Sequence, residues 1–101
     1  MPTVFVLSKL RKGVDPRKYE NWVREYDYPH SKNLKSIVHY RAYRITEVLQ
    51  GHQEYSYVEN IEITDVEQYK RDLDTPMFKE LARQWSEFVE EGRLLFTEEI
   101  R

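Results

Sequence analysis

The stretch YSYVENIEI (residues 55–63) lies near the middle of the chain and alternates between two sets of side chains. A period of two residues is typical of a β-strand with one face towards a core. The members of one set would share a face: Tyr55, Tyr57, Glu59, Ile61 and Ile63. We therefore predict a strand over residues 55–63 that carries a single carboxylate, Glu59, on an otherwise apolar and aromatic face.

The first part of the chain predicts another strand and then a helix. Residues 3–10 (TVFVLSKL) are mostly apolar, which indicates a strand with both faces covered. Asp15 and Pro16 form a typical helix start, with Asp as the N-cap residue and Pro at the first helical position. A single apolar stripe at helical spacing follows: Tyr19, Trp22, Val23 and Tyr26.

A polar loop and a second strand are predicted between this helix and the central segment. Pro29 cannot continue a regular helix, so we expect the helix to end there and residues 27–33 to form a loop. Residues 36–45 (SIVHYRAYRI) indicate a strand. With regular alternation, one face of it would carry Ile37, His39, Arg41, Tyr43 and Ile45, and the other Val38, Tyr40, Ala42 and Arg44.

Two helices and a last strand are predicted after the central segment. A capping-box pattern begins a short helix over residues 66–73. The pair Thr-Pro at residues 75–76 begins a second helix, which Gly92 is expected to end as a C-cap residue. Residues 93–100 (RLLFTEEI) then predict the final strand.

The resulting order of elements is β-α-β-β-α-β. This order predicts a single α+β domain over residues 1–101 with a ferredoxin-like fold, in which helices cover one face of a four-stranded antiparallel sheet. Both faces of the predicted strands carry apolar or aromatic side chains, yet the helices cover only one of them. A large exposed apolar face is rare in a monomer, so we predict a symmetric homodimer joined through the second face.

Composition excludes several classes of protein. The formal net charge of −2 over 101 residues argues against a dedicated nucleic-acid-binding protein, which is normally basic. The absence of cysteine excludes disulfides, thiolate metal sites and a cysteine nucleophile, and it is in keeping with a reducing cytoplasm. No stretch reaches the roughly 20 apolar residues of a membrane span, and the first residues lack the features of a secretory signal.

No pattern for a metal or a cofactor is present. The three histidines, His30, His39 and His52, lack the spacing of known metal-binding motifs. The three glycines lie where turns or caps need them, so no glycine-rich phosphate loop exists. We therefore predict neither a metal nor an organic cofactor.

His39 and Glu59 are the candidate catalytic residues. His39 lies on a strand face between Ile37 and Arg41, either as a core histidine with a satisfied hydrogen bond or as an acid–base group in a cavity. Glu59 either forms a salt bridge, for example with Arg41, or has a raised pKa in a dry pocket.

Other residues are candidates for binding a ligand. A pocket with several tyrosines and a few polar groups suits a flat aromatic molecule. Its predicted wall contains Arg41, Tyr43, Tyr55 and Tyr57. The polar segment that precedes the second strand is either a solvated loop or the rim of the pocket, and it contributes Asp27, His30, Lys35 and Ser36.

Three motifs carry a resemblance to a known family. They are GVDPRKYENW (13–22), DYPHSKNLKS (27–36) and YSYVE (55–59). Through them the chain resembles the REDY-like protein HapK family over nearly its whole length. The residues that match the family pattern are Asp27, Lys35, Ser36, Tyr57 and Glu59. His30 stands where relatives often have a small hydroxyl residue.

The resemblance implies a fold and a biological setting. The family has the dimeric α+β barrel fold, and its members accompany bacterial gene clusters for prodigiosin-type tripyrrole pigments and bisindole compounds. Some relatives are implicated in cyclising indolic intermediates without a metal. We therefore expect a cytoplasmic homodimer that binds a pyrrolic or indolic intermediate and assists a step of pigment synthesis.

Three interpretations of that role remain open. The first is an enzyme of proton transfer that catalyses a cyclisation, dehydration or isomerisation, with His39 or Glu59 as the acid–base group and Tyr57 as a hydrogen-bond donor. The second is a cofactor-free monooxygenase of the same fold. The third is a non-catalytic protein that shelters a reactive intermediate or helps to assemble other pathway enzymes. Fold alone does not choose among them.

Overall fold

Strands and helices follow one another in the order that the sequence predicts. The computed structural model describes all residues from Met1 to Arg101. The elements are β1 (Thr3–Leu10), α1 (Pro16–Trp22), the π-helical segment η1 (Val23–Asp27), α2 (Tyr28–Ser31), β2 (Ile37–Arg44), β3 (Tyr57–Ile63), α3 (Val66–Leu73), α4 (Pro76–Phe88) and β4 (Val89–Thr97).

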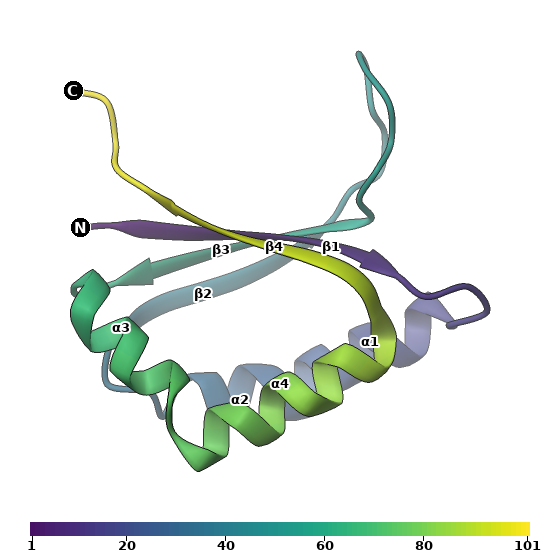
Figure 1. The fold of residues 1–101 in the computed structure, drawn as a ribbon. Helices are drawn as coiled ribbons and strands as arrows, with labels where there is room; N and C mark the ends of the chain where they lie inside the picture. The colour runs from purple at the N-terminus through teal and green to yellow at the C-terminus, as the bar shows by residue number, and fades with distance from the viewer.

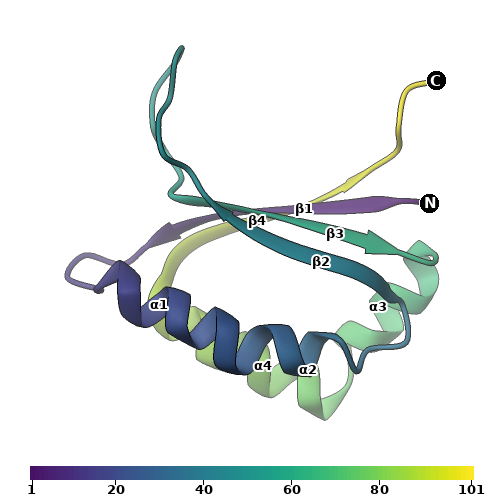
Figure 2. The same cartoon turned by 180° about the vertical axis from the view of Figure 1, so that it is seen from behind.

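The four strands form one antiparallel sheet in the order β2-β3-β1-β4. All helices lie on one face of it, as Figure 1 shows and the opposite view in Figure 2 confirms. The predicted α+β, ferredoxin-like architecture is therefore confirmed. No helix has the length and apolarity needed to cross a bilayer.

The alternating residues of β1 and β3 build the core beneath the helices. Val4 and Val6 of β1 and Ile61 and Ile63 of β3 are buried, and Val4 lies directly opposite Ile61 across the two central strands. Tyr69 of α3 packs on this cluster. Burial of each aliphatic side chain contributes roughly 1.5–3 kcal/mol. The predicted inner face of the central strand is correct, although β3 begins at Tyr57 rather than at Tyr55.

The first helical arm continues past Pro29, so the loop predicted over residues 27–33 is wrong. Within the segment η1, the N–H of Tyr28 donates to the carbonyl oxygen of Val23, one residue further back than in an α-helix. In a regular helix the proline ring would clash with the carbonyl group four residues before it. The wider π turn takes the preceding carbonyl groups out of that register, and helix α2 follows up to Ser31.

A β-bulge near the start of β2 separates Ile37 from the face predicted for it. Ile37 pairs with Ile63, and His39 pairs with the adjacent Glu62. Val38 is therefore an extra residue in β2 without a partner in β3. After the bulge Tyr40 points to the helix side, opposite Ile61, and His39 points to the other face. His39 therefore faces away from the helices and no longer shares a face with Ile37, whereas the predicted alternation of residues 39–44 is retained.

Helix α4 ends at Phe88, four residues before the predicted C-cap, and β4 begins at once with Val89. Gly92 is a strand residue that pairs with Ser8 of β1. Its Cα faces the ring of Trp85, and a Cβ at this position would overlap the indole. The glycine is thus required by the close approach of an aromatic ring, not by a helix end.

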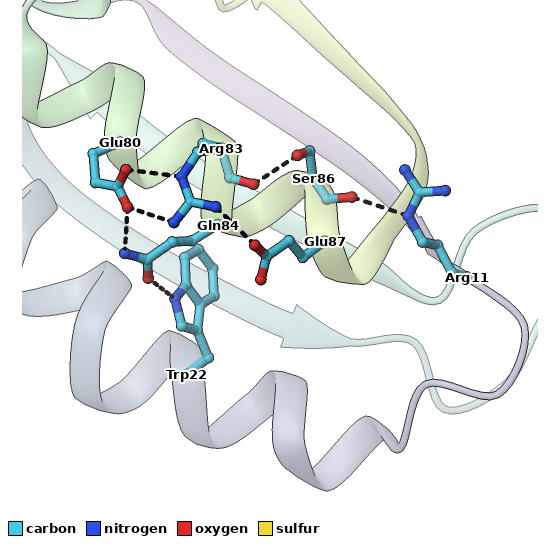
Figure 3. A network of polar contacts seen from close by, with 7 residues as sticks. All are labelled: Arg11, Trp22, Glu80, Arg83, Gln84, Ser86 and Glu87. Atoms are coloured by element: carbon cyan, nitrogen blue, oxygen red, sulfur yellow. Dashed lines mark hydrogen bonds and ion pairs between the residues drawn. The ribbon is translucent and has the colours of Figure 1, made fainter.

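A polar network joins α1 to α4 above the sheet. The indole N–H of Trp22 donates to Oε1 of Gln84 at 2.8 Å, and Nε2 of Gln84 donates to Glu80 at 2.9 Å. Arg83 holds the same Glu80 from the other side (Figure 3). The two helices that roof the sheet are therefore tied to each other by hydrogen bonds as well as by apolar contacts.

Candidate functional site

A cavity of about 120 Å³ lies between the inner face of the sheet and the helices. Its walls are mainly apolar and aromatic and include Val6, Ile37, Ile61, Tyr69, Phe78, Leu81, Ala82, Trp85 and Leu94. Four polar side chains also line it: Asp27, Ser31, Tyr40 and Glu59. Concave apolar sites with a few polar groups that converge are typical of ligand-binding sites.

The polar side chains of the cavity form one hydrogen-bonded cluster. The hydroxyl oxygen of Tyr40 lies 2.5 Å from Oδ2 of Asp27 and 2.8 Å from Oε1 of Glu59. Ser31 donates its hydroxyl to Oδ1 of Asp27 at 2.9 Å. Asp27 is 3% exposed and Glu59 is 5% exposed, so both carboxyl groups are removed from bulk water.

The hydrogen-bond geometry requires that one of the two carboxyl groups, Asp27 or Glu59, carries a proton. Tyr40 has a single hydroxyl hydrogen and can donate to only one of the two carboxyl groups. If both groups were ionised, its second short contact would join two acceptors. One carboxyl is therefore protonated and donates to the Tyr40 oxygen. Glu59 is that group, because Tyr40 is its only hydrogen-bond partner, whereas Asp27 also accepts from Ser31.

The electrostatic environment leads to the same assignment. Burial, followed by the nearby charge of Asp27, raises the pKa of Glu59 to about 8. Burial also raises the pKa of Asp27, but hydrogen bonds from Tyr40 and Ser31 and the neighbouring His30 oppose this rise. Of the two alternatives left open for Glu59, the structure supports the raised pKa rather than a salt bridge to Arg41.

Two irregularities of the backbone bring the cluster together. Asp27 is the last residue of the π-helical segment, one turn before Ser31. Tyr40 reaches the inner face only because the bulge of β2 precedes it. Glu59 comes from the regular central strand, opposite Val6. Irregular turns of this kind recur at functional sites, where they redirect a side chain.

Only two of the ten predicted site residues line the cavity, namely Asp27 and Glu59. His39 and Arg41 are exposed on the opposite face of the sheet. Tyr43 and Tyr57 border a separate groove, where the Tyr57 hydroxyl donates to Glu20. Asp27, predicted as part of the rim, instead lies inside.

The remaining predicted residues have other surroundings. Lys35 is exposed. Ser36 is buried and donates both its backbone N–H and its hydroxyl to Asp72, which ties the start of β2 to α3. His30 stacks on Tyr26 with ring centroids 3.9 Å apart and contacts the Tyr26 carbonyl oxygen through Nδ1. Tyr55 lies under the guanidinium of Arg93.

Tyr40 and Ser31 are the members of the cluster that the sequence did not single out. Asp27 and Ser31 are four residues apart, which is a helical spacing. This spacing was not used, because a loop was predicted over residues 27–33. Tyr40 had no such signal, because its direction depends on a bulge. The cluster contains two carboxyl groups, and no group of three or more potential metal ligands occurs in the chain.

These features define a class: a ferredoxin-like α+β protein with two buried carboxyl groups in an apolar cavity. Residues 2–100 match the family model of the REDY-like protein HapK. The chain therefore belongs to the REDY-like protein HapK family.

The chain is similar to several solved structures. The crystal structure of HapK from Hahella chejuensis is 30% identical, with a TM-score of 0.82 over 99% of this chain and 93% of that one. A dabb family protein with a ferredoxin-like fold from Mesorhizobium loti shares 16% identity, with a TM-score of 0.77 over 99% and 97% of the two chains. A dimeric ferredoxin-like protein from Thermobifida fusca shares 9%, with a TM-score of 0.76 over 97% and 90%. No curated protein matches the chain.

Proposed function

We propose that the protein is a proton-transfer enzyme of bacterial secondary metabolism that acts on a pyrrolic or indolic intermediate. The observation that carries the proposal is the pair of buried carboxyl groups that share a proton through Tyr40. Paired carboxyl groups whose pKa values are driven apart are suited to act as acid and base in one reaction. Protonated Glu59 would be the general acid, and ionised Asp27 the general base.

The size and lining of the cavity support a small aromatic substrate. An apolar cavity of about 150 Å³ is enough to hold benzene, and the cavity here measures about 120 Å³. The cavity is therefore somewhat smaller than one that holds benzene, so its size suits a single five-membered ring such as a pyrrole and not a whole tripyrrole. A reaction on a single ring, such as a cyclisation, dehydration or isomerisation, needs one proton delivered and one removed, which this pair supplies.

Family membership supports the setting of the proposal. The proposed role is a step in the synthesis of a prodigiosin-like pigment in the cytoplasm, alongside other enzymes of the pathway. Proton transfer by this pair needs neither a metal nor an organic cofactor. Glu59 would hold the proton that is delivered, and Asp27 would accept the proton that is removed.

Replacement of Glu59 by Gln is expected to lower turnover of the pathway intermediate by roughly a hundredfold or more, because Gln keeps the shape but cannot deliver a proton. Glu47→Gln is the matched control, since Glu47 is exposed in the connection between β2 and β3 and should leave turnover unchanged. Product formation by purified protein, with pigment output of a complemented host as a second readout, measures both.

Each other outcome excludes the proposal in a different way. Equal turnover in Glu59→Gln and the wild type would remove Glu59 from the chemistry. Consumption of dioxygen with the substrate, measured with an oxygen electrode, would indicate a monooxygenase. Saturable quenching of ligand fluorescence without product would indicate a binding protein.

The proposal includes a homodimer formed through the face of the sheet opposite the helices. That face carries half-buried or exposed apolar side chains on all four strands: Phe5, Leu7, Tyr43, Val58 and Leu95. A sheet face with this many exposed apolar side chains is usually covered by a partner. The dimeric relative from Thermobifida fusca has the same fold.

Light scattering during size-exclusion chromatography is expected to give twice the monomer mass at micromolar concentration. Leu7→Lys should shift the protein to the monomer, because it places a charge at the centre of the proposed interface. Leu49→Lys is the control, since Leu49 is 96% exposed in the connection between β2 and β3. A monomeric wild-type protein would contradict the proposed assembly.

A further inference from the structure

A second, larger hollow lies beside the cavity and shares none of its residues. It is an open groove of about 310 Å³ between α1 and the edge strand β2, called the outer groove below. Its lining consists of Tyr19, Glu20, Val23, Arg24, Tyr28, Ala42, Tyr43, Arg44 and Tyr57. The volume falls in the range of pockets that hold molecules of several rings.

One carboxylate in the outer groove is fully engaged by its neighbours. Glu20 accepts two hydrogen bonds from the guanidinium of Arg44, at 2.8 and 2.5 Å, and one from the Tyr57 hydroxyl at 2.7 Å. The bonds from Arg44 and Tyr57 lower the pKa of Glu20 to about 2. Glu20 is therefore ionised at neutral pH, and its charge is compensated by Arg44.

The second guanidinium of the groove, that of Arg24, makes no direct contact with a carboxylate, although its charge also acts on Glu20. Arg24 donates through Nη2 to the side-chain amide oxygen of Asn21 at 2.6 Å, whereas the ion pair with Glu20 is made by Arg44. The charged residues that line the outer groove are Glu20, Arg24 and Arg44, so the groove has a net charge of one positive unit. The remaining donors of Arg24 are free for a bidentate contact with an anion such as a carboxylate.

Aromatic rings supply the rest of the groove. Tyr28 is fixed there, because its hydroxyl oxygen accepts the backbone N–H of Ala42 at 2.7 Å. Tyr57 also lines the groove and is fixed there, because its hydroxyl donates to Glu20 at 2.7 Å. Rings held in this way offer flat contact area at low entropic cost to a planar ligand.

We propose that the outer groove is a second binding site, for a planar aromatic carboxylate. The rings of the ligand would lie against Tyr28 and Tyr57, and its carboxylate would contact Arg24. This site does not depend on the function proposed for the cavity, because no lining residue is common to both.

The wall between the two sites is a pair of tyrosine rings. Tyr28 borders the outer groove, Tyr40 borders the cavity, and their rings meet edge to face with centroids 5.0 Å apart. Arg24 lines the outer groove and not the cavity, so a variant of Arg24 changes only the groove. The two sites can therefore be tested separately on the intact protein.

Two probes of equal shape test the proposal: indole-2-carboxylate and its neutral counterpart indole-2-carboxamide. We expect the carboxylate to bind at least roughly tenfold more tightly, since a charge-assisted contact is worth more than a neutral one. Titration calorimetry gives the affinities, and amide chemical shifts locate the site. Arg24→Gln should remove the preference for the carboxylate.

Arg83→Gln is the matched control, because Arg83 lies on α4 and is paired with Glu80 and Glu87 there. It should leave both affinities unchanged. Equal affinity for the two probes, an unchanged preference in Arg24→Gln, or chemical shifts confined to residues of the cavity would each overturn the proposal.

Discussion

The wild-type protein should lose about 3 kcal/mol of unfolding free energy between pH 5 and pH 8, and Glu59→Gln should lose almost none. The cause is the raised pKa of Glu59, which lies at about 8 in the folded protein against an ordinary value of 4.5. Each unit of difference between the folded and unfolded pKa corresponds to about 1.4 kcal/mol. The effect is large because the carboxyl group is fully enclosed.

The sign of this effect follows from where the proton is held. Above pH 4.5 the unfolded chain releases the proton of Glu59, whereas the folded protein keeps it up to about pH 8. The folded state then binds more protons than the unfolded state, so stability falls as the pH rises. Above pH 8 both states are ionised at this residue, and its contribution becomes constant.

Urea unfolding of the wild type and the variant at pH 5, 6, 7 and 8 measures the difference. Glu62→Gln is the control, because Glu62 precedes the last residue of the same strand and lies on the opposite face. It should retain the pH dependence of the wild type. A wild-type stability that stays constant or increases over this range would show that Glu59 is ionised in the fold, which would contradict the shared proton.

This measurement needs no substrate, so it separates the state of the site from its function. A protein with the predicted pH dependence but without turnover would have the acid–base pair and lack the proposed chemistry. The destabilisation itself also bears on function. A buried carboxyl group that lowers stability at neutral pH is retained at a cost, which is typical of residues kept for a reaction or for binding.

The architecture could be predicted because periodic patterns and caps act locally. The N-cap residues Asp15, Asp65 and Thr75 each accept a hydrogen bond from the first helical turn, at the places where the sequence indicated helix starts. The alternation of residues 57–63 corresponds to a strand that is buried on every second residue. These features depend on neighbours within a few positions, which the sequence displays directly.

The site could be predicted only in part, because it depends on departures from regular periods. Glu59 was found since it interrupts an apolar face of a regular strand. His39 was preferred to Tyr40 because a bulge cannot be recognised by counting every second residue. Asp27 was expected at a rim because Pro29 normally ends a helix, whereas here a π turn admits it.

Gly92→Ala is expected to destabilise the protein by about 3 kcal/mol, although Ala is normally a mild replacement for Gly in a strand. An added Cβ would overlap the indole of Trp85 and lie 3.0 Å from two further ring atoms. The ring cannot move without loss, because it packs against both halves of the core and donates to the Tyr19 hydroxyl at 3.3 Å. Overpacking of this kind typically costs 1–3 kcal/mol, and a lost hydrogen bond adds about 1 kcal/mol.

Comparison with Gly13→Ala separates this clash from backbone strain. Gly13 has a φ of 82° and no atom near the added Cβ, so its replacement should cost only the backbone strain of about 1–2 kcal/mol. In the Gly92→Ala background, Trp85→Phe should restore part of the stability, because the smaller ring leaves room for the methyl group. If Gly92→Ala unfolded at the same urea concentration as the wild type, the Trp85 ring would be free to move. The part of the cavity wall that Trp85 forms would then not be rigid.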